Sequence, residues 1–177
     1  MIKIDGKNLF IEECVHVARH GEQVGLSKSA EENLLHSRKN LELMLRKDKP
    51  IYGINTGYGI FADRKISIND TERLNRNLIL SHSVGTGDSL DQEVVKTAML
   101  IRANTLSKGY LGIRIEFIRN ILKMINAGVV PVIPSQGSLG SSGDLCQLSH
   151  LALVLSKDKT DKNLESGKAI FNGKFLS

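Results

Sequence analysis

The spacing of apolar residues predicts a mainly helical chain. Apolar side chains recur every three or four residues in most of the long segments, which places them along one face of an α-helix. The segment 9–20 has mixed spacing and is also predicted to be helical. The predicted helices cover residues 9–20, 29–49, 70–82, 91–106 and 115–127, followed by one that runs through Leu155.

Residues at the ends of these segments support the same boundaries. Small polar side chains accept hydrogen bonds from the first backbone N–H groups of a helix, and glycine adopts the left-handed conformation where helices end. The predicted N-terminal caps are Ser29 in a capping box with Glu32, Asp70, Asp91 and Asp144. The predicted ends lie at Gly21 and Gly25 for the first helix, and at Pro50 and Gly128 for two later ones.

Strand patterns are short and few. A short strand is predicted at residues 3–4, and two apolar triplets at 169–171 and 174–176 flank the dipeptide Asn172-Gly173. Asn-Gly between such runs is a strong signal for a β-hairpin. Because no linker or internal repeat divides the chain, residues 1–177 are expected to form a single, mainly α domain.

Composition excludes several classes of protein. A compact monomer of 19.5 kDa exposes about 8,500 Å², so the chain can bury a core without disulfides or metals. The 24 basic and 19 acidic residues are spread along the chain, which argues against nucleic-acid binding. The two cysteines form no metal or redox motif, and no segment resembles a signal peptide or membrane span. A cytoplasmic protein without a metal site is expected.

Three glycine-rich segments, at residues 52–59, 81–87 and 137–145, carry the candidate chemistry. Any one of them alone fits a turn followed by a helix cap. Common motifs fail here: the G-x-G-x-x-A run at Gly57 lacks the acidic residue of a dinucleotide site, and Asp144 stands where a phosphate-binding loop needs lysine. A hydrolase that pairs Ser142 with His82 or His150 finds no support in the spacing.

The tripeptide Ser141-Ser142-Gly143 suggests a different reaction. If the backbone is bent tightly, the amide nitrogen of Gly143 can attack the carbonyl carbon of Ser141 and close a five-membered ring. Glycine is required because a Cβ atom would block this approach. Loss of one water from the ring and of the Ser142 hydroxyl as a second water leaves a methylidene-imidazolone, which is a backbone electrophile. A strained, buried loop is the expected place for it.

Four segments in the same order resemble histidine ammonia-lyases: residues 52–59, 81–87, 102–109 and 137–145. The resemblance runs through the whole chain but corresponds to the N-terminal portion of that family, whose members are longer. It implies the mainly helical fumarase/aspartase-like ammonia-lyase fold, a methylidene-imidazolone formed from Ser141, Ser142 and Gly143, and no external cofactor. The chain departs from the usual pattern at Ser141, where the family has alanine, and at Cys146-Gln147, where it has Ala-Pro.

The resemblance also assigns roles to side chains. Tyr52 would be the general base that removes the β-proton of the substrate, and Tyr58 would pack nearby. Ser81 and His82 occupy the substrate-selectivity position, where Ser-His is typical of histidine-specific members. The residues expected to shape the two catalytic loops are Asn55, Thr56, Gly57, Gly59 and Asp144. Without the resemblance, Tyr52 is a half-buried loop aromatic, His82 a helix cap and His150 a structural residue.

The expected activity is therefore the non-oxidative deamination of L-histidine to trans-urocanate and ammonia. By the resemblance, the full-length protein is a homotetramer whose active sites draw on several subunits. The 177-residue chain alone is expected to be inactive, because the later substrate-binding residues of the family lie beyond Ser177. The alternatives are a lyase or aminomutase acting on tyrosine or phenylalanine, and an inactive regulatory or assembly fragment.

Overall fold

Six α-helices make up about half of the computed structural model, which describes residues 1–47, 49–141, 143–156 and 167–176. They are α1 (Ile11–His20), α2 (Lys28–Leu45), α3 (Ile68–His82), α4 (Gln92–Leu106), α5 (Ile115–Ala127) and α6 (Leu145–Leu155). The prediction of a mainly α fold is confirmed. No helix of the described ranges is both long and apolar enough to cross a membrane.

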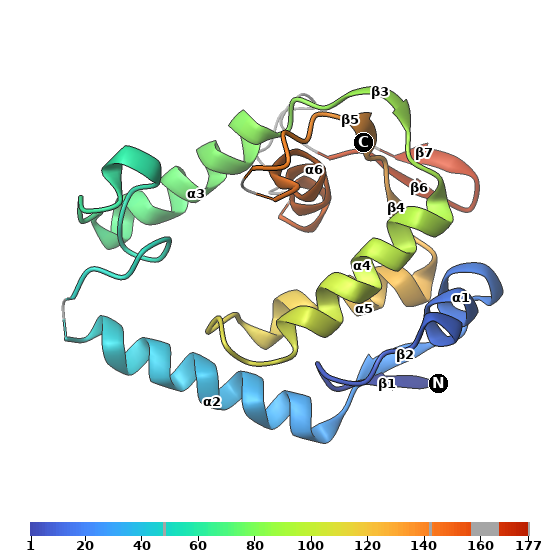
Figure 1. The fold of residues 1–177 in the computed structure, drawn as a ribbon, viewed down its shortest axis with the longest axis horizontal. Coiled ribbons are helices and arrows are strands. Elements are labelled where there is room, and N and C mark those ends of the chain that lie inside the picture. Colours follow the sequence, from blue (N-terminus) through green and yellow to red (C-terminus); the bar gives the residue numbers. More distant parts are fainter. Residues whose placement is uncertain (48, 142, 157–166, 177) are drawn as a thin grey trace.

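The core lies around α4 and α5, which pack against each other at the centre of the fold (Figure 1). Met99 and Leu100 of α4 are fully buried, as are Ile118 and Ile121 of α5. Helix α1 packs on α4, and α2 contacts α5. The apolar stripes predicted for these two central segments therefore form the centre of the protein.

Helix α3 lies away from this core. It packs against α6 on the side of the molecule opposite α2 (Figure 1), and none of its described side chains is fully buried. The chain exposes 11413 Å², whereas a compact monomer of this mass exposes about 8,500 Å². The fold is therefore more open than expected for a compact monomer of this mass.

Three predicted helix starts are wrong by two or three residues. Helix α1 begins at Ile11, where the carboxylate of Glu13 accepts a hydrogen bond from the backbone N–H of Phe10. Helix α2 is capped by Ser27, whose hydroxyl accepts from the N–H of Ala30, and not by Ser29. Serine is a favoured capping residue at either position. Ser27 caps the helix because its backbone is extended and the helical conformation begins at the next residue.

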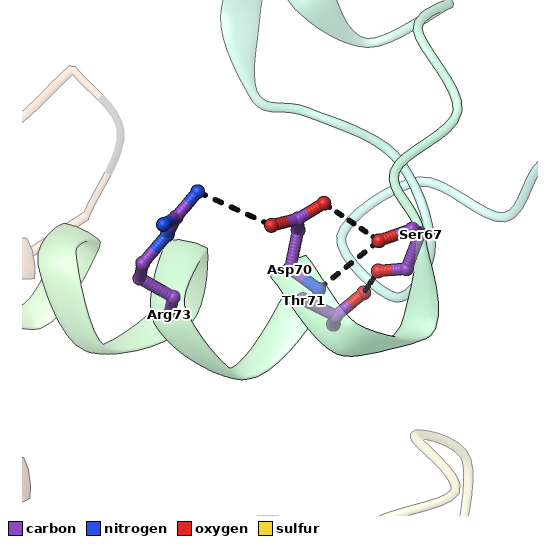
Figure 2. A network of polar contacts seen from close by, with 4 residues as sticks. All are labelled: Ser67, Asp70, Thr71 and Arg73. Carbon is purple, nitrogen blue, oxygen red and sulfur yellow. Dashed lines mark hydrogen bonds and ion pairs between the residues drawn. The ribbon is translucent and has the colours of Figure 1, made fainter.

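The third correction concerns α3, which Ser67 caps instead of Asp70 (Figure 2). The hydroxyl of Ser67 accepts from the N–H of Asp70 at 3.1 Å and donates to its carboxylate at 2.7 Å. Asp70 also pairs with Arg73 at 3.1 Å, and the Thr71 hydroxyl donates to the carbonyl of Ser67. This network fixes the start of the helix whose other end carries Ser81 and His82.

The remaining helix ends follow the predictions more closely. Gly21 and Gly128 both have left-handed conformations, with φ of 68° and 73°, directly after α1 and α5. Asp91 precedes α4 as predicted, although its side chain makes no capping hydrogen bond. Helix α2 ends at Leu45, before Pro50 is reached.

Seven short strands complete the described fold, together with a 3-10 turn, η1 (Gly59–Phe61). The predicted strand and hairpin are confirmed as β1 (Ile2–Ile4) and as β6 (Ala169–Phe171) with β7 (Lys174–Leu176), and Asn172 and Gly173 both have positive φ. Four strands were not predicted: β2 (Val24–Leu26), parallel to β1; β3 (Thr86–Ser89), antiparallel to β5 (Pro134–Gln136); and β4 (Val130–Pro131), antiparallel to β6.

One segment of the family resemblance has a packing role in this structure. The side-chain Oδ1 of Asn104, in α4, accepts a hydrogen bond from the backbone N–H of Gly6 at 2.9 Å. Its partner lies 98 residues earlier in the chain. Asn104 therefore ties the loop after β1 to the central helix.

Candidate active site

A cavity of about 250 Å³ lies where the end of α3 meets the loop before α6. It joins Ser81 and His82, the expected selectivity pair, to Ser141 and Gly143 of the tripeptide expected to form the ring. The complete lining is Ser81, His82, Val84, Gly137, Ser138, Leu139, Ser141, Gly143, Leu145 and Cys146. The fold thus brings together two sets of residues that lie about sixty positions apart in the sequence.

The hydrogen bonds of His82 define which ring nitrogen is available. Its Nδ1 lies 2.8 Å from the carbonyl oxygen of Leu78 and 3.0 Å from the hydroxyl of Ser81, which itself donates to Leu78. A carbonyl oxygen only accepts, so Nδ1 carries the proton. In the neutral ring Nε2 is then an acceptor, and the hydrogen bonds described in the structure leave it unused.

The loop before α6 is expected to form the ring, is called the ring-forming loop for that reason, and has two left-handed glycines. Gly140 and Gly143 have φ of 77° and 84°, values that favour glycine over every other residue. The Ser138 hydroxyl donates to the carboxylate of Asp144 and so joins the two ends of the loop. Ser142, which would supply the methylidene carbon, lies outside the described residues.

Two expectations for this loop are wrong. Asp144 precedes α6, but its side chain makes no capping hydrogen bond, because the carboxylate is turned toward Ser138. The loop was expected to be buried, yet Ser141 and Gly143 are exposed and Leu139 is 91% exposed. No described element of the chain packs over Leu139, and this leaves the apolar side chain in solvent.

At the wall of the cavity, two glycines allow the backbone segments to touch. A Cβ atom on Gly137 would lie 3.1 Å from the Cα of Gly85 and 2.5 Å from the Sγ of Cys146. A Cβ on Gly85 would meet Cys146 at 3.1 Å. Cys146 is 5% exposed, so its thiol fills the space between the His82 segment and the ring-forming loop.

Sequence reasoning did not single out this contact or the role of Cys146 in it. A glycine is in general a signal that another backbone segment approaches closely. The sequence around Gly85 and Gly137 does not indicate that these two glycines contact each other. The neighbouring Gln147 has a buried Oε1 atom with no hydrogen-bond partner among the described residues. Both departures from the family pattern, Cys146 and Gln147, thus fall at the tightly packed start of α6.

The imidazole of His150 also reaches this contact from α6. Its Nε2 accepts a hydrogen bond from the backbone N–H of Gly85 at 3.1 Å. Burial lowers the pKa of His150, which favours the neutral ring that this bond requires. His150 therefore faces inward, toward the segment that follows His82.

Tyr52 lies outside the described lining of the cavity and is 63% exposed. Its ring meets that of Tyr58 edge to face, with the centroids 6.0 Å apart. The Tyr58 hydroxyl donates to Oδ1 of Asn75 in α3 at 2.7 Å. Burial, with a smaller contribution from Tyr52, raises the pKa of Tyr58. The structure therefore does not bring the proposed base to the ring-forming loop of the same chain.

Polar contacts hold the loop that carries Tyr52. Oδ1 of Asn55 accepts from the N–H of Ile51 at 2.6 Å, and its Nδ2 donates to the carbonyl of Lys49. Thr56 is 3% exposed, and its hydroxyl donates to the carbonyl of Gly57. The N–H of Gly57 donates to the carbonyl of Arg64, and Gly59 begins η1. Contacts of these four residues fold residues 49–64 into a closed loop.

Comparison with known proteins places this geometry in a family. Residues 9–170 match the aromatic amino acid lyase family, and the chain belongs to it. Histidine ammonia-lyase of Alkaliphilus oremlandii is 46% identical over 176 residues, which are 99% of this chain and 33% of that protein. The chain thus spans about one third of the length of the curated relatives it matches.

Solved structures show the same fold. Ergothionase from Treponema denticola, an ergothioneine-degrading enzyme, superposes with a TM-score of 0.89 at 31% identity, over 99% of this chain and 33% of its own. Phenylalanine aminomutase from Pantoea agglomerans superposes with a TM-score of 0.88 at 32% identity, over 100% of this chain and 33% of its own. The arrangement described here is therefore shared by members that act on different amino acid derivatives.

Proposed function

We propose that residues 1–177 are the N-terminal part of a cytoplasmic histidine ammonia-lyase, which converts L-histidine to trans-urocanate and ammonia. The observation that carries this proposal is the cavity shared by Ser81 and His82 with Ser141 and Gly143. The 46% identity to a histidine ammonia-lyase supports the choice of substrate.

The residues present fit a methylidene-imidazolone. Gly143 has the left-handed φ and the bare Cα that let its nitrogen approach a neighbouring carbonyl carbon. Ser141 would give the ring only its carbonyl carbon, so a serine side chain in place of alanine is a substituent outside the ring. This group supplies an electrophile that takes up the substrate amine and makes it a better leaving group.

The chain's own side chains would bind the substrate and move its proton. Because Nδ1 of His82 donates to Leu78, its Nε2 can accept a hydrogen bond from the N–H of a substrate imidazole. Tyr52 is assigned to remove the β-proton. Since Tyr52 is exposed and outside the cavity lining of its own chain, we assign it to the site of a neighbouring subunit in a homotetramer.

The exposed surface supports such an assembly. The chain leaves roughly a third more area in solvent than a compact monomer of its mass, and Leu35 and Met44 of α2 and Leu139 of the ring-forming loop contribute apolar side chains to it. Positioning accounts for much of catalysis, so we expect the 177-residue chain alone to be inactive. Measurable urocanate formation by the purified chain would contradict this expectation.

An aminomutase or a lyase for phenylalanine or tyrosine is the second candidate. The TM-score of 0.88 to a phenylalanine aminomutase shows that the fold alone does not separate the two activities. The identity of residue 82 does: a hydrogen-bonding imidazole suits a substrate with ring nitrogens, whereas a hydrocarbon ring offers it no partner.

Two measurements on the full-length enzyme test the proposal. Mass spectrometry of the peptide spanning residues 141–143 should show the loss of two waters relative to its sequence. Incubation with L-histidine, L-phenylalanine and L-tyrosine in parallel should yield urocanate from histidine as the main product. An unmodified peptide in active enzyme would exclude the electrophile, and formation of a β-amino acid would assign the protein to the aminomutases.

A further inference from the structure

The hydrogen bond between Gly85 and His150 links two parts of the candidate site. Gly85 follows His82 by three residues and precedes β3. His150 lies one helical turn after Cys146 on α6, so both side chains point from the same face of that helix. The bond of 3.1 Å therefore connects the segment that carries His82 to the helix that follows the ring-forming loop.

The contact leaves little freedom for the Gly85 backbone. Its missing Cβ would lie 3.0 Å from Nε2 of His150, 3.0 Å from Cβ of Pro134 and 3.1 Å from Sγ of Cys146. The apolar contacts limit translation, while the hydrogen bond sets the direction of the N–H group. His150 is the partner that gives this contact a fixed orientation, since thiol and proline neighbours supply no strong acceptor.

We propose that His150 is a positioning residue for substrate binding: its neutral Nε2 holds the Gly85 N–H and thereby keeps His82 at a fixed distance from the ring-forming loop. The inference rests on the proposed function in naming histidine as the ligand of His82. Loss of the bond leaves a partly buried N–H unsatisfied, and the His82 segment can then move away from α6.

Glutamine and leucine at position 150 separate hydrogen bonding from packing. The amide oxygen of glutamine is the same number of bonds from Cβ as Nε2 of histidine, so His150→Gln keeps an acceptor. His150→Leu keeps apolar volume and removes the acceptor. His36→Leu is the matched control, because His36 is exposed on α2.

In the full-length enzyme, hydrogen exchange of the peptide covering residues 83–89 should be about tenfold faster in His150→Leu and close to the parent in His150→Gln and His36→Leu. The KM for histidine should rise about tenfold in His150→Leu with a smaller change in kcat, because an interaction that binds substrate and transition state alike affects KM. Restoration of both values in His150→Gln would support the proposal.

Three outcomes would overturn it. Unchanged hydrogen exchange in His150→Leu would show that the bond from Gly85 to His150 does not hold residues 83–89 in place. Faster exchange with an unchanged KM would show that this bond has only a structural role. Equal defects in His150→Gln and His150→Leu would assign the effect to packing. If the parent enzyme does not act on histidine, the proposed function fails, whereas the exchange data still report on the hydrogen bond.

Discussion

Nδ1 of His82 donates a hydrogen bond to the carbonyl oxygen of Leu78, one helical turn earlier, over 2.8 Å. This contact adds a second side-chain donor to a carbonyl in the last turns of α3, which already accepts from the Ser81 hydroxyl, and at the same time fixes the tautomer of the ring. The two roles predicted for His82 are therefore compatible, because one uses Nδ1 and the other Nε2.

Replacing His82 with leucine tests the second role. In the full-length enzyme, His82→Leu should lower kcat/KM for histidine about ten- to a hundredfold, because a polar substrate group is then left without its partner. The value for phenylalanine or tyrosine should rise relative to histidine. Steady-state kinetics with the three amino acids measures both effects, and an unchanged preference for histidine would reduce His82 to a helix cap.

Removing the hydroxyl of Tyr52 tests its assignment as the base. Tyr52→Phe should reduce kcat by about 10² to 10⁴-fold and leave the mass loss of two waters intact, since the hydroxyl takes no part in ring formation. The control is Tyr58→Phe, which removes the bond to Asn75 and should affect kcat much less. Equal losses in the two variants would indicate that Tyr52 acts through packing.

Asn104 should contribute to stability and not to the reaction. Asn104→Leu leaves the N–H of Gly6 without its acceptor, which should lower the free energy of unfolding by about 1–3 kcal/mol. The matched change Asn120→Leu alters an exposed residue of α5 and should cost less. Denaturant unfolding of the two variants compares them, and equal stabilities would mean that the bond to Gly6 contributes nothing.

Gln147 offers a stabilising substitution. Its Oε1 is buried and accepts no hydrogen bond from the described residues, so Gln147→Met, which has a similar shape, should raise the free energy of unfolding by about 1 kcal/mol. That gain corresponds to a Tm higher by about 2–4 °C. Gln92→Met at an exposed position of α4 is the control. A lower Tm for Gln147→Met would show that the amide has a partner in solution.

Several elements could be read from the sequence because local signals specify them. The stripe of α5 and the left-handed Gly128 after it depend on helical period and on backbone sterics within a few residues. The same holds for the Asn172-Gly173 turn, whose two positive φ angles favour those residues. The cap of α3 was misplaced because Ser67 and Asp70 are both good caps, and their mutual hydrogen bonds decide between them.

Strands without a side-chain pattern could not be read in this way. All four residues of β3 are exposed. Because neither face of the strand is buried, its sequence does not alternate between apolar and polar positions. Its pairing with β5 instead follows from backbone hydrogen bonds between segments about fifty residues apart. A glycine-rich segment such as 81–87 therefore looks like a loop until its partner strand is known.

The sequence by itself determined the helices, the hairpin and the tripeptide Ser141-Ser142-Gly143, because each depends on bonding and sterics within one short segment. The tertiary structure decided that Ser81 and His82 share a cavity with this loop and that Tyr52 lies outside its lining. It also decided that Gly85 and Gly137 approach each other beside the thiol of Cys146, and that the N–H of Gly85 donates a hydrogen bond to His150. Such contacts depend on how α3 and α6 pack, and packing is set by many distant side chains acting together.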